Sequence, residues 1–179
     1  MFSRRKTDCY CTETVQKMNN SDRENFLFEI RPARSDEWET AMELAFRIFL
    51  KYEAKEYGPQ GIRNFAEFVT DETLKKLFLQ GKYILFVAMK EDKMIGMISL
   101  RSGNHISLLF VDNEYHRKGV GKALIKYLQE YMLSSTGYIK MTVNAAPYGV
   151  PFYHAVGFTD TGVETKTEGI IYTPMEFYL

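Results

Sequence analysis

The stretch HRKGVGK, residues 116–122, decides how the fold is interpreted. It follows an apolar, strand-like run at 105–111 and opens a segment, from Gly119 to about Leu133, whose apolar residues recur at helical spacing. Glycine lets the backbone approach a bound group closely, and the N–H groups at a helix N-terminus attract anions. Basic side chains add positive charge at the same place. The stretch therefore predicts a phosphate-binding turn between a strand and a helix.

Spacing excludes the two best-known phosphate loops. A Walker loop needs an earlier glycine and a Ser or Thr directly after its Gly-Lys pair, and both are missing around Gly121 and Lys122. A Rossmann fingerprint that starts at Gly119 needs a third glycine where this chain has Leu124. The strands before the turn also suggest hairpins rather than a parallel βαβ unit. The turn thus belongs to another class of phosphate site.

A second informative stretch, FYHAVGF at residues 152–158, follows Asn144 on the next strand-like run. Preceded by LFVDNEY at 109–115, HRKGVG resembles the central motif of GNAT acetyltransferases: Gln or Arg, two residues, Gly, one residue, then Gly or Ala. His116 departs from the usual Gln or Arg, which weakens the match only slightly because the family uses this loop mainly through backbone amides. FYHAVGF is similar to the family's Phe-Tyr, three-residue, Gly-Phe segment. Two matches in the right order make the resemblance specific.

The rest of the chain supplies the expected elements. Residues 1–25 are polar and lack periodicity, which predicts a flexible N-terminal extension before a single domain at 26–179. Alternation at 26–30 predicts the first strand, and Ser35 is expected to cap a helix that runs to Tyr52. The other expected elements are a helical region in two pieces at 62–78, strands at 83–89, 94–100, 105–111 and 138–144, a short helix at 151–155, and a hairpin of 158–165 with 170–178.

The resemblance implies a GNAT fold, an α/β (α+β) domain whose mixed, mostly antiparallel sheet of about seven strands is flanked by helices. It also implies acetyl-CoA as co-substrate, with the central strand beside the pantetheine arm and the turn around the pyrophosphate. The cofactor-binding residues expected on this basis are Leu109, Phe110, Val111, His116, Arg117, Lys118, Gly119, Val120, Gly121, Lys122 and Asn144.

The resemblance further implies catalytic roles. Tyr153 matches the family tyrosine that protonates or hydrogen-bonds the leaving thiolate, although an ordinary core aromatic is the alternative. Branches of the family that modify protein lysines use a carboxylate early on the central strand as base. His105 stands at that offset, fourteen residues before Gly119, and an imidazole suits this work at neutral pH, with a solvated or structural histidine as the alternative. Glu53 and Glu56, near the end of the first helix, are alternative bases and expected contacts of the acceptor amine, or members of a solvated helix face.

Composition narrows the partners. Lys+Arg and Asp+Glu are equal at 23 each, so no overall field attracts nucleic acid. Cys9 and Cys11 form neither a disulfide framework nor a metal pattern, and no run has the length of a signal peptide or membrane span. We therefore expect a cytoplasmic enzyme without metal, nucleic acid or membrane, which binds acetyl-CoA and a small-molecule or protein amine and is a possible homodimer. The rival is a non-catalytic acyl-CoA-binding or interaction module, against which Tyr153 argues.

Overall fold

The computed structural model of the chain describes residues 14–15 and 27–179. Most of the expected extension at 1–25 lies outside the described residues, so its flexibility and the domain boundary at residue 26 stay predictions. Thr14 and Val15 are the exception: they form β1 (Thr14–Val15), which pairs with the next strand through Ile30 and Glu29.

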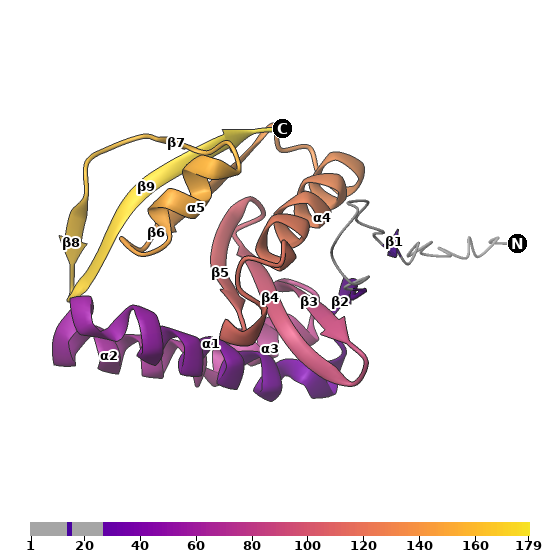
Figure 1. Cartoon of the computed structure of the whole chain (residues 1–179), viewed down its shortest axis with the longest axis horizontal. Coiled ribbons are helices and arrows are strands. Elements are labelled where there is room, and N and C mark those ends of the chain that lie inside the picture. The colour runs from indigo at the N-terminus through magenta and orange to yellow at the C-terminus, as the bar shows by residue number, and fades with distance from the viewer. Residues whose placement is uncertain (1–13, 16–26) are drawn as a thin grey trace, which may run out of the picture.

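One sheet organises the domain (Figure 1). Its strands lie side by side in the order β1-β2-β3-β4-β5-β6-β9-β7. Strand β8 also pairs with β9, outside this order. All pairs are antiparallel except β5 with β6, which confirms the predicted mixed, mostly antiparallel sheet. The strands are β2 (Glu29–Pro32), β3 (Ile84–Lys90), β4 (Lys93–Arg101), β5 (His105–Val111), β6 (Lys140–Ala145), β7 (Thr159–Asp160), β8 (Thr165–Thr167) and β9 (Ile170–Tyr178).

Helices cover both faces of this sheet, and each face has its own apolar core. On one face lie α1 (Trp38–Tyr52), α2 (Ala54–Val69) and α3 (Glu72–Leu79). On the other face lie α4 (Val120–Ser135) and α5 (Val150–Ala155). In Figure 1, α1 and α2 follow one another along the lower side, and α4 and α5 lie above.

Two local expectations need correction. Ser35 does not cap α1, because it begins the 3₁₀ turn η1 (Ser35–Glu37); there the Glu37 carboxylate accepts the Arg34 N–H at 2.7 Å and pairs with Arg31 at 2.6 Å. The expected single strand at 158–165 is two short strands, β7 and β8, and between them Thr161 donates its N–H to the Pro174 carbonyl at 2.8 Å. Pro174 has no backbone N–H, so it cannot donate the next hydrogen bond of the strand pairing.

The expected helical region at 62–78 begins earlier, as α2 from Ala54, and residues 58–61 lie at a bend within this helix. Gly58 has a φ of 67°, a left-handed conformation that glycine adopts without steric cost, and Pro59 follows it. The bend changes the direction of the chain beside the junction of α1 and α2.

The parallel pair β5 and β6 is short, and this matters most for the site. Only His105 with Thr142 and Ile106 with Val143 are in register. From residue 107 onward the two strands are no longer paired, so the edge of β5 that faces β6 is free of sheet partners over Leu109 to Val111. Backbone groups on a free edge can pair with an extended ligand.

Candidate active site

The turn between β5 and α4 has the geometry of an anion site. It comprises η2 (Asn113–Tyr115), a left-handed Arg117 with a φ of 61°, and Gly119 with a φ of 86° as the N-cap of α4. The amides of Val120, Gly121 and Lys122 open the helix and therefore have no acceptor within it. The predicted turn is thus present, and exposed Arg117 and Lys122 lie next to these amides.

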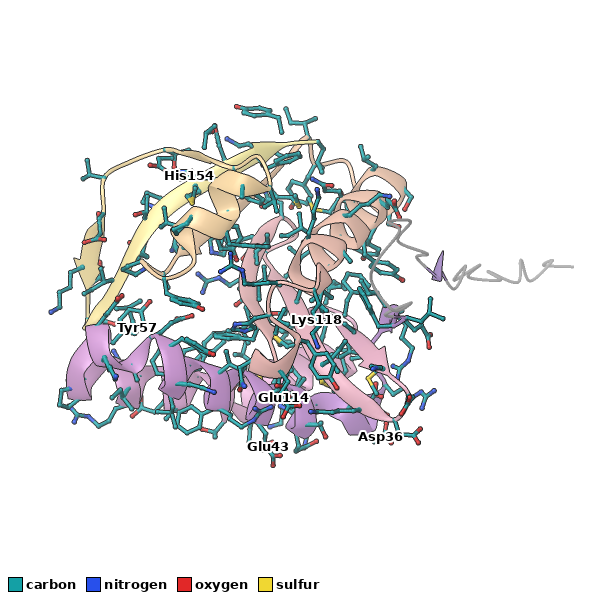
Figure 2. All side chains as sticks on the ribbon, in the orientation of Figure 1. Asp36, Glu43, Tyr57, Glu114, Lys118 and His154 are labelled. Carbon is teal, nitrogen blue, oxygen red and sulfur yellow. The ribbon has the colours of Figure 1, made fainter. Side chains whose placement is uncertain are left out.

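Asp112 anchors this turn at the end of β5. Its side chain is 4% exposed and accepts the Glu114 N–H at 3.1 Å, the Arg47 guanidinium at 3.1 Å and the Lys93 ammonium at 3.4 Å. Burial alone would raise the pKa of the Asp112 carboxyl, but these donors lower it below its ordinary value. The start of η2 is therefore fixed by a buried, ionised carboxylate, and Figure 2 shows Glu114 and Lys118 on the turn that follows.

His116, the residue that departs from the family motif, is tied to the strand it follows. Its Nε2 lies 2.8 Å from the Val111 carbonyl oxygen, so the ring bridges the turn and the last residue of β5. Its other contact is the ring of Tyr52, at a centroid distance of 5.1 Å. His116 thus joins the turn to the C-terminal end of α1.

Gly121 has a packing role as well as a place in the turn. A Cβ at this position would lie 3.2 Å from ring atoms of Phe152 on α5. The absence of a side chain therefore lets α4 and α5 approach closely, which links the two motif stretches physically.

The predicted strand contacts lie along the free edge of β5. Leu109 and Val111 are half-buried, whereas Phe110 is buried against the α1 and α2 side. Asn144 is exposed on β6, beyond the last residue that pairs with β5. The two strands therefore present these residues where they have parted.

Tyr153 is buried on α5 with its ring between Phe152 and Phe158, at centroid distances of 5.4 and 5.2 Å. Within residues 27–179 its hydroxyl makes no hydrogen bond. Burial raises the pKa of the phenol, and the charge of Glu53 raises it further. Tyr153 therefore keeps its proton at neutral pH and has a hydroxyl available to a bound group.

Glu53 occupies the junction of α1 and α2, where its N–H closes α1 on the Phe49 carbonyl at 2.9 Å. Burial, with a smaller effect of Glu56, raises the pKa of its carboxyl to about 7. The same carboxylate adds to the raised pKa of three phenols on different elements, those of Tyr57, Tyr148 and Tyr153. The charge of Glu53 thus acts on Tyr153, and exposed Glu56 lies beside Glu53, with its N–H donating to the Glu53 carbonyl oxygen at 3.0 Å.

His105 has a different setting. Its Nδ1 lies 2.8 Å from the Thr142 hydroxyl, at the end of β5 that still pairs with β6. Burial, with a smaller effect of Arg101, lowers the pKa of the imidazole to about 4. The turn between β5 and α4 begins at the other end of this strand, about 20 Å away at the rise of an antiparallel strand. The structure does not bring His105 to the turn, and the imidazole is uncharged at neutral pH.

Sequence reasoning missed a tyrosine that completes the surroundings of Glu53. Tyr148, on the loop between β6 and α5, stacks on Tyr52 at a centroid distance of 5.0 Å. No motif marks Tyr148, and its nearness to Tyr52 depends on the packing of the two halves of the domain. The only available signal was its position shortly before FYHAVGF.

Two kinds of feature are absent from residues 14–15 and 27–179. No helix there is long and apolar enough to span a membrane. No three His, Cys, Asp or Glu side chains in the same residues gather as metal ligands.

Comparison with known proteins gives a consistent result. The acetyltransferase (GNAT) domain family matches residues 53–179. An uncharacterized N-acetyltransferase of Escherichia coli, YafP, is 30% identical over 130 residues, covering 73% of this chain and 80% of that protein. The E. coli peptidyl-lysine N-acetyltransferase YjaB is 33% identical over 99 residues, covering 54% and 64%. The structure of the PaiA N-acetyltransferase from Thermoplasma acidophilum in complex with coenzyme A superposes with a TM-score of 0.71 at 21% identity, covering 85% and 99%.

Proposed function

This chain belongs to the GNAT family of N-acetyltransferases, and on that premise we propose that it transfers an acetyl group from acetyl-CoA to a primary amine by direct attack in a ternary complex. The observation that carries the proposal is the strand-to-helix turn at Gly119, which follows the unpaired edge of β5, together with the buried Tyr153 on α5. The Glu53 carboxylate, which can accept a proton, raises the pKa of the Tyr153 phenol, which can donate one.

Acetyl-CoA is the substrate that the turn fits. The amides of Val120, Gly121 and Lys122, with exposed Arg117 nearby, suit a pyrophosphate. The free edge of β5 suits the amide groups of a pantetheine arm, which can pair with backbone as an added strand does. The thioester would then lie toward the part of the molecule that holds Tyr153.

Glu53 is proposed as the base. An alkyl ammonium has a pKa of about 10, so its full deprotonation by a carboxyl of pKa about 7 costs about 4 kcal/mol. The amine that attacks has already lost one proton to water. Once it has attacked the thioester carbonyl, the positively charged nitrogen is far more acidic, and Glu53 takes the second proton. An ordinary carboxylate, with a pKa near 4.5, would be a weaker base than this one.

Tyr153 is proposed as the acid. The nitrogen–carbon bond forms, the carbon–sulfur bond breaks, and the electron pair of that bond leaves on the sulfur. The Tyr153 hydroxyl donates its proton or a hydrogen bond to this thiolate as its charge develops. A backbone N–H on the free edge of β5 is proposed to stabilise the oxyanion between the two steps.

The acceptor is proposed to be an amine. The proposed base, Glu53, lies among acidic and aromatic side chains, which suit a cationic amine, rather than beside a nucleophilic side chain of the protein. YjaB, a similar protein, is named for peptidyl-lysine, whose side chain ends in a primary amine. The rival, a non-catalytic acyl-CoA-binding module, would not need a carboxyl group whose pKa is raised and which acts on a buried tyrosine.

A thiol-release assay with acetyl-CoA and a panel of primary amines tests the function. We expect amine-dependent release of CoA and a product that is heavier by one acetyl group in mass spectrometry. Glu53→Gln should retain acetyl-CoA binding in calorimetry and lose most of the release. Binding of acetyl-CoA without turnover of any amine would favour the non-catalytic rival.

A further inference from the structure

Resting on the proposed function, we infer that His116 is a positioning residue that serves both substrates through two separate contacts of one side chain. A ring nitrogen holds the turn that is proposed to bind acetyl-CoA, and the ring itself holds the end of α1 next to Glu53. Gln, one of the two residues usual at this place in the family motif, could make the first contact but not the second.

The first contact ties the turn to the strand that it follows. Backbone groups of successive residues in a strand point to opposite edges, and the Asp112 N–H donates to the Ile95 carbonyl oxygen on β4 at 2.9 Å. The Val111 carbonyl therefore points to the free edge of β5, where Nε2 of His116 lies 2.8 Å from its oxygen. A carbonyl oxygen only accepts, so Nε2 carries the hydrogen and donates it.

The turn needs such a tie because part of its backbone is strained. Arg117, directly after His116, has a φ of 61°, a left-handed conformation that is costly for a residue with a side chain. The hydrogen bond to Val111 helps to hold this conformation and fixes the start of α4 relative to the edge of β5. The proposed pyrophosphate and pantetheine contacts then require no rearrangement of the turn when acetyl-CoA binds.

The second contact joins the same side chain to the helical layer. The rings of His116 and Tyr52 are 5.1 Å apart between centroids and are tilted by 36°. Tyr52 also stacks on Tyr148, at 5.0 Å. Because Tyr52 is the last residue of α1, the position of this helix end depends on one ring from the turn and one from the loop before α5.

The end of α1 matters because Glu53 is the single residue between α1 and α2. The direction of its side chain therefore depends on where one helix ends and the next begins. The start of α2 is held separately, since the Tyr57 hydroxyl donates to the Ile171 carbonyl oxygen at 3.0 Å; Figure 2 shows Tyr57 near the start of β9. A displacement of about 1 Å can cost on the order of 10²-fold in rate, so the ring of His116 should affect kcat.

Two substitutions separate the contacts. His116→Gln keeps a side-chain N–H that can donate to the Val111 carbonyl, and it removes the ring. His116→Phe keeps a ring against Tyr52 and removes the donor. If each contact serves one substrate, the two variants should fail in opposite parameters, a pattern that general loosening of the structure would not produce.

The measurements are the calorimetric affinity for acetyl-CoA, and kcat at saturating acetyl-CoA with the amine of the panel that the wild type acetylates fastest. For His116→Gln we expect an affinity within about twofold of wild type and a kcat lower by at least about tenfold. For His116→Phe we expect an affinity lower by about three- to tenfold, as for the loss of one hydrogen bond, and a kcat within about twofold.

Tyr52→Leu is the reciprocal variant, because it removes the same ring contact from the other side. It should leave acetyl-CoA affinity within about twofold of wild type and lower kcat at least as much as His116→Gln does. The double variant should lose no more kcat than Tyr52→Leu alone, since both changes break one contact. Tyr178→Leu replaces an exposed tyrosine at the end of β9 and is the control that should keep both parameters.

If the wild type acetylates an amine and the two His116 variants do not show this crossed pattern, the inference is wrong and acetyl transfer stands. Failure of the wild type to acetylate any amine of the panel would contradict the proposed function and this inference with it. Thermal unfolding followed by circular dichroism checks that each variant is folded. If His116→Phe does not fold, His116→Met keeps an apolar contact with the Tyr52 ring without a donor and is held to the same values.

Discussion

Beyond the effect of burial, the carboxylate charge of Glu53 raises the pKa of the Tyr153 phenol, so the junction of α1 and α2 acts electrostatically on α5. The two groups come from opposite halves of the chain, one from the junction of α1 and α2 and the other from the FYHAVGF stretch. The proposed reaction needs a proton acceptor at the amine and a proton donor at the sulfur, atoms that are bonded to one carbon in the tetrahedral intermediate. We propose that Glu53 and Tyr153 are these two groups.

Glu53→Gln should remove the acidic limb of the pH–rate profile. The base works only when ionised, so kcat/KM of the wild type should fall as the pH drops below about 7, the pKa to which burial raises this carboxyl. Glutamine cannot accept the proton, and we expect a loss on the order of 10²-fold at pH 8. Once kcat/KM is expressed per neutral amine, so that the ionisation of the substrate is removed, the profile of the variant should be flat below pH 8. Steady-state kinetics from pH 5.5 to 9 measure both effects.

Glu56→Gln is the matched control for this experiment. Glu56 is exposed on the same segment, and its negative charge contributes to the raised pKa of Glu53. Removing that charge should move the acidic limb to lower pH and leave the plateau within a few-fold of wild type. A limb that survives in Glu53→Gln would contradict the assignment of the base.

Glu53→Gln should also stabilise the fold at high pH. The folded-state pKa of about 7 lies above the ordinary 4.5, so the folded protein holds a proton that the unfolded chain has lost between these values. Stability therefore falls as pH rises from 4.5 to 7, and the penalty is complete above 7. The variant should gain about 3 kcal/mol in the free energy of unfolding at pH 8 and almost nothing at pH 4.5. Urea denaturation at the two pH values tests this; equal gains at both would show that the carboxyl is not perturbed by folding.

Tyr153→Phe should lower kcat while leaving acetyl-CoA affinity nearly intact. The hydroxyl meets the sulfur only as negative charge develops there, so its loss affects the transition state more than the ground state. The expected decrease is on the order of 10²-fold in a step where chemistry limits the rate. The phenylalanine ring retains the packing against Phe152 and Phe158. A kcat within a few-fold of wild type would remove Tyr153 from the mechanism.

The sequence predicted most of the fold because its strongest signals are local. Alternation and helical spacing located β3 to β6, α1, α4 and α5 within a few residues, since these elements bury one face each. The division of 158–165 into β7 and β8 was missed. It depends on the hydrogen bonds that Pro174 of the neighbouring strand β9 can make, and these are not visible in the sequence of 158–165 itself. Ser35 was expected as a cap from its residue type alone. In the structure the Glu37 carboxylate instead accepts hydrogen bonds from the Arg31 side chain and the Arg34 N–H.

The site was predicted less completely because its parts meet only in the folded chain. The turn and Tyr153 lie in motifs and could be named from the sequence. The pKa values of Glu53 and His105 come from burial, which no local pattern reports. The stack of Tyr148 on Tyr52 joins residues nearly a hundred positions apart, and only the packing of the two halves produces it.

His105→Gln should leave the pH–rate profile unchanged. The imidazole has a pKa of about 4 and contacts Thr142, so it neither titrates near neutrality nor lies beside the phosphate turn. Glutamine can keep a hydrogen bond to the threonine hydroxyl. We expect kcat/KM within about threefold of wild type across the same pH range used for Glu53→Gln. Loss of the limb near pH 7 in this variant would assign the base to His105 instead.

Gly121→Ala should change sign in its effect on stability when Phe152 is shortened. In the wild type the new methyl group would lie 3.2 Å from the Phe152 ring, and such overpacking costs about 1–3 kcal/mol, more than the helix preference of about 1 kcal/mol for Ala over Gly restores. On a Phe152→Leu background the contact is relieved, so the same substitution should become neutral or stabilising. Urea denaturation of the two single variants and the double variant gives this coupling. Equal costs of Gly121→Ala in both backgrounds would show that the glycine serves the turn alone. The acetyl-CoA affinity of the double variant, measured by calorimetry, then shows how far binding by the turn depends on the absence of a side chain at Gly121.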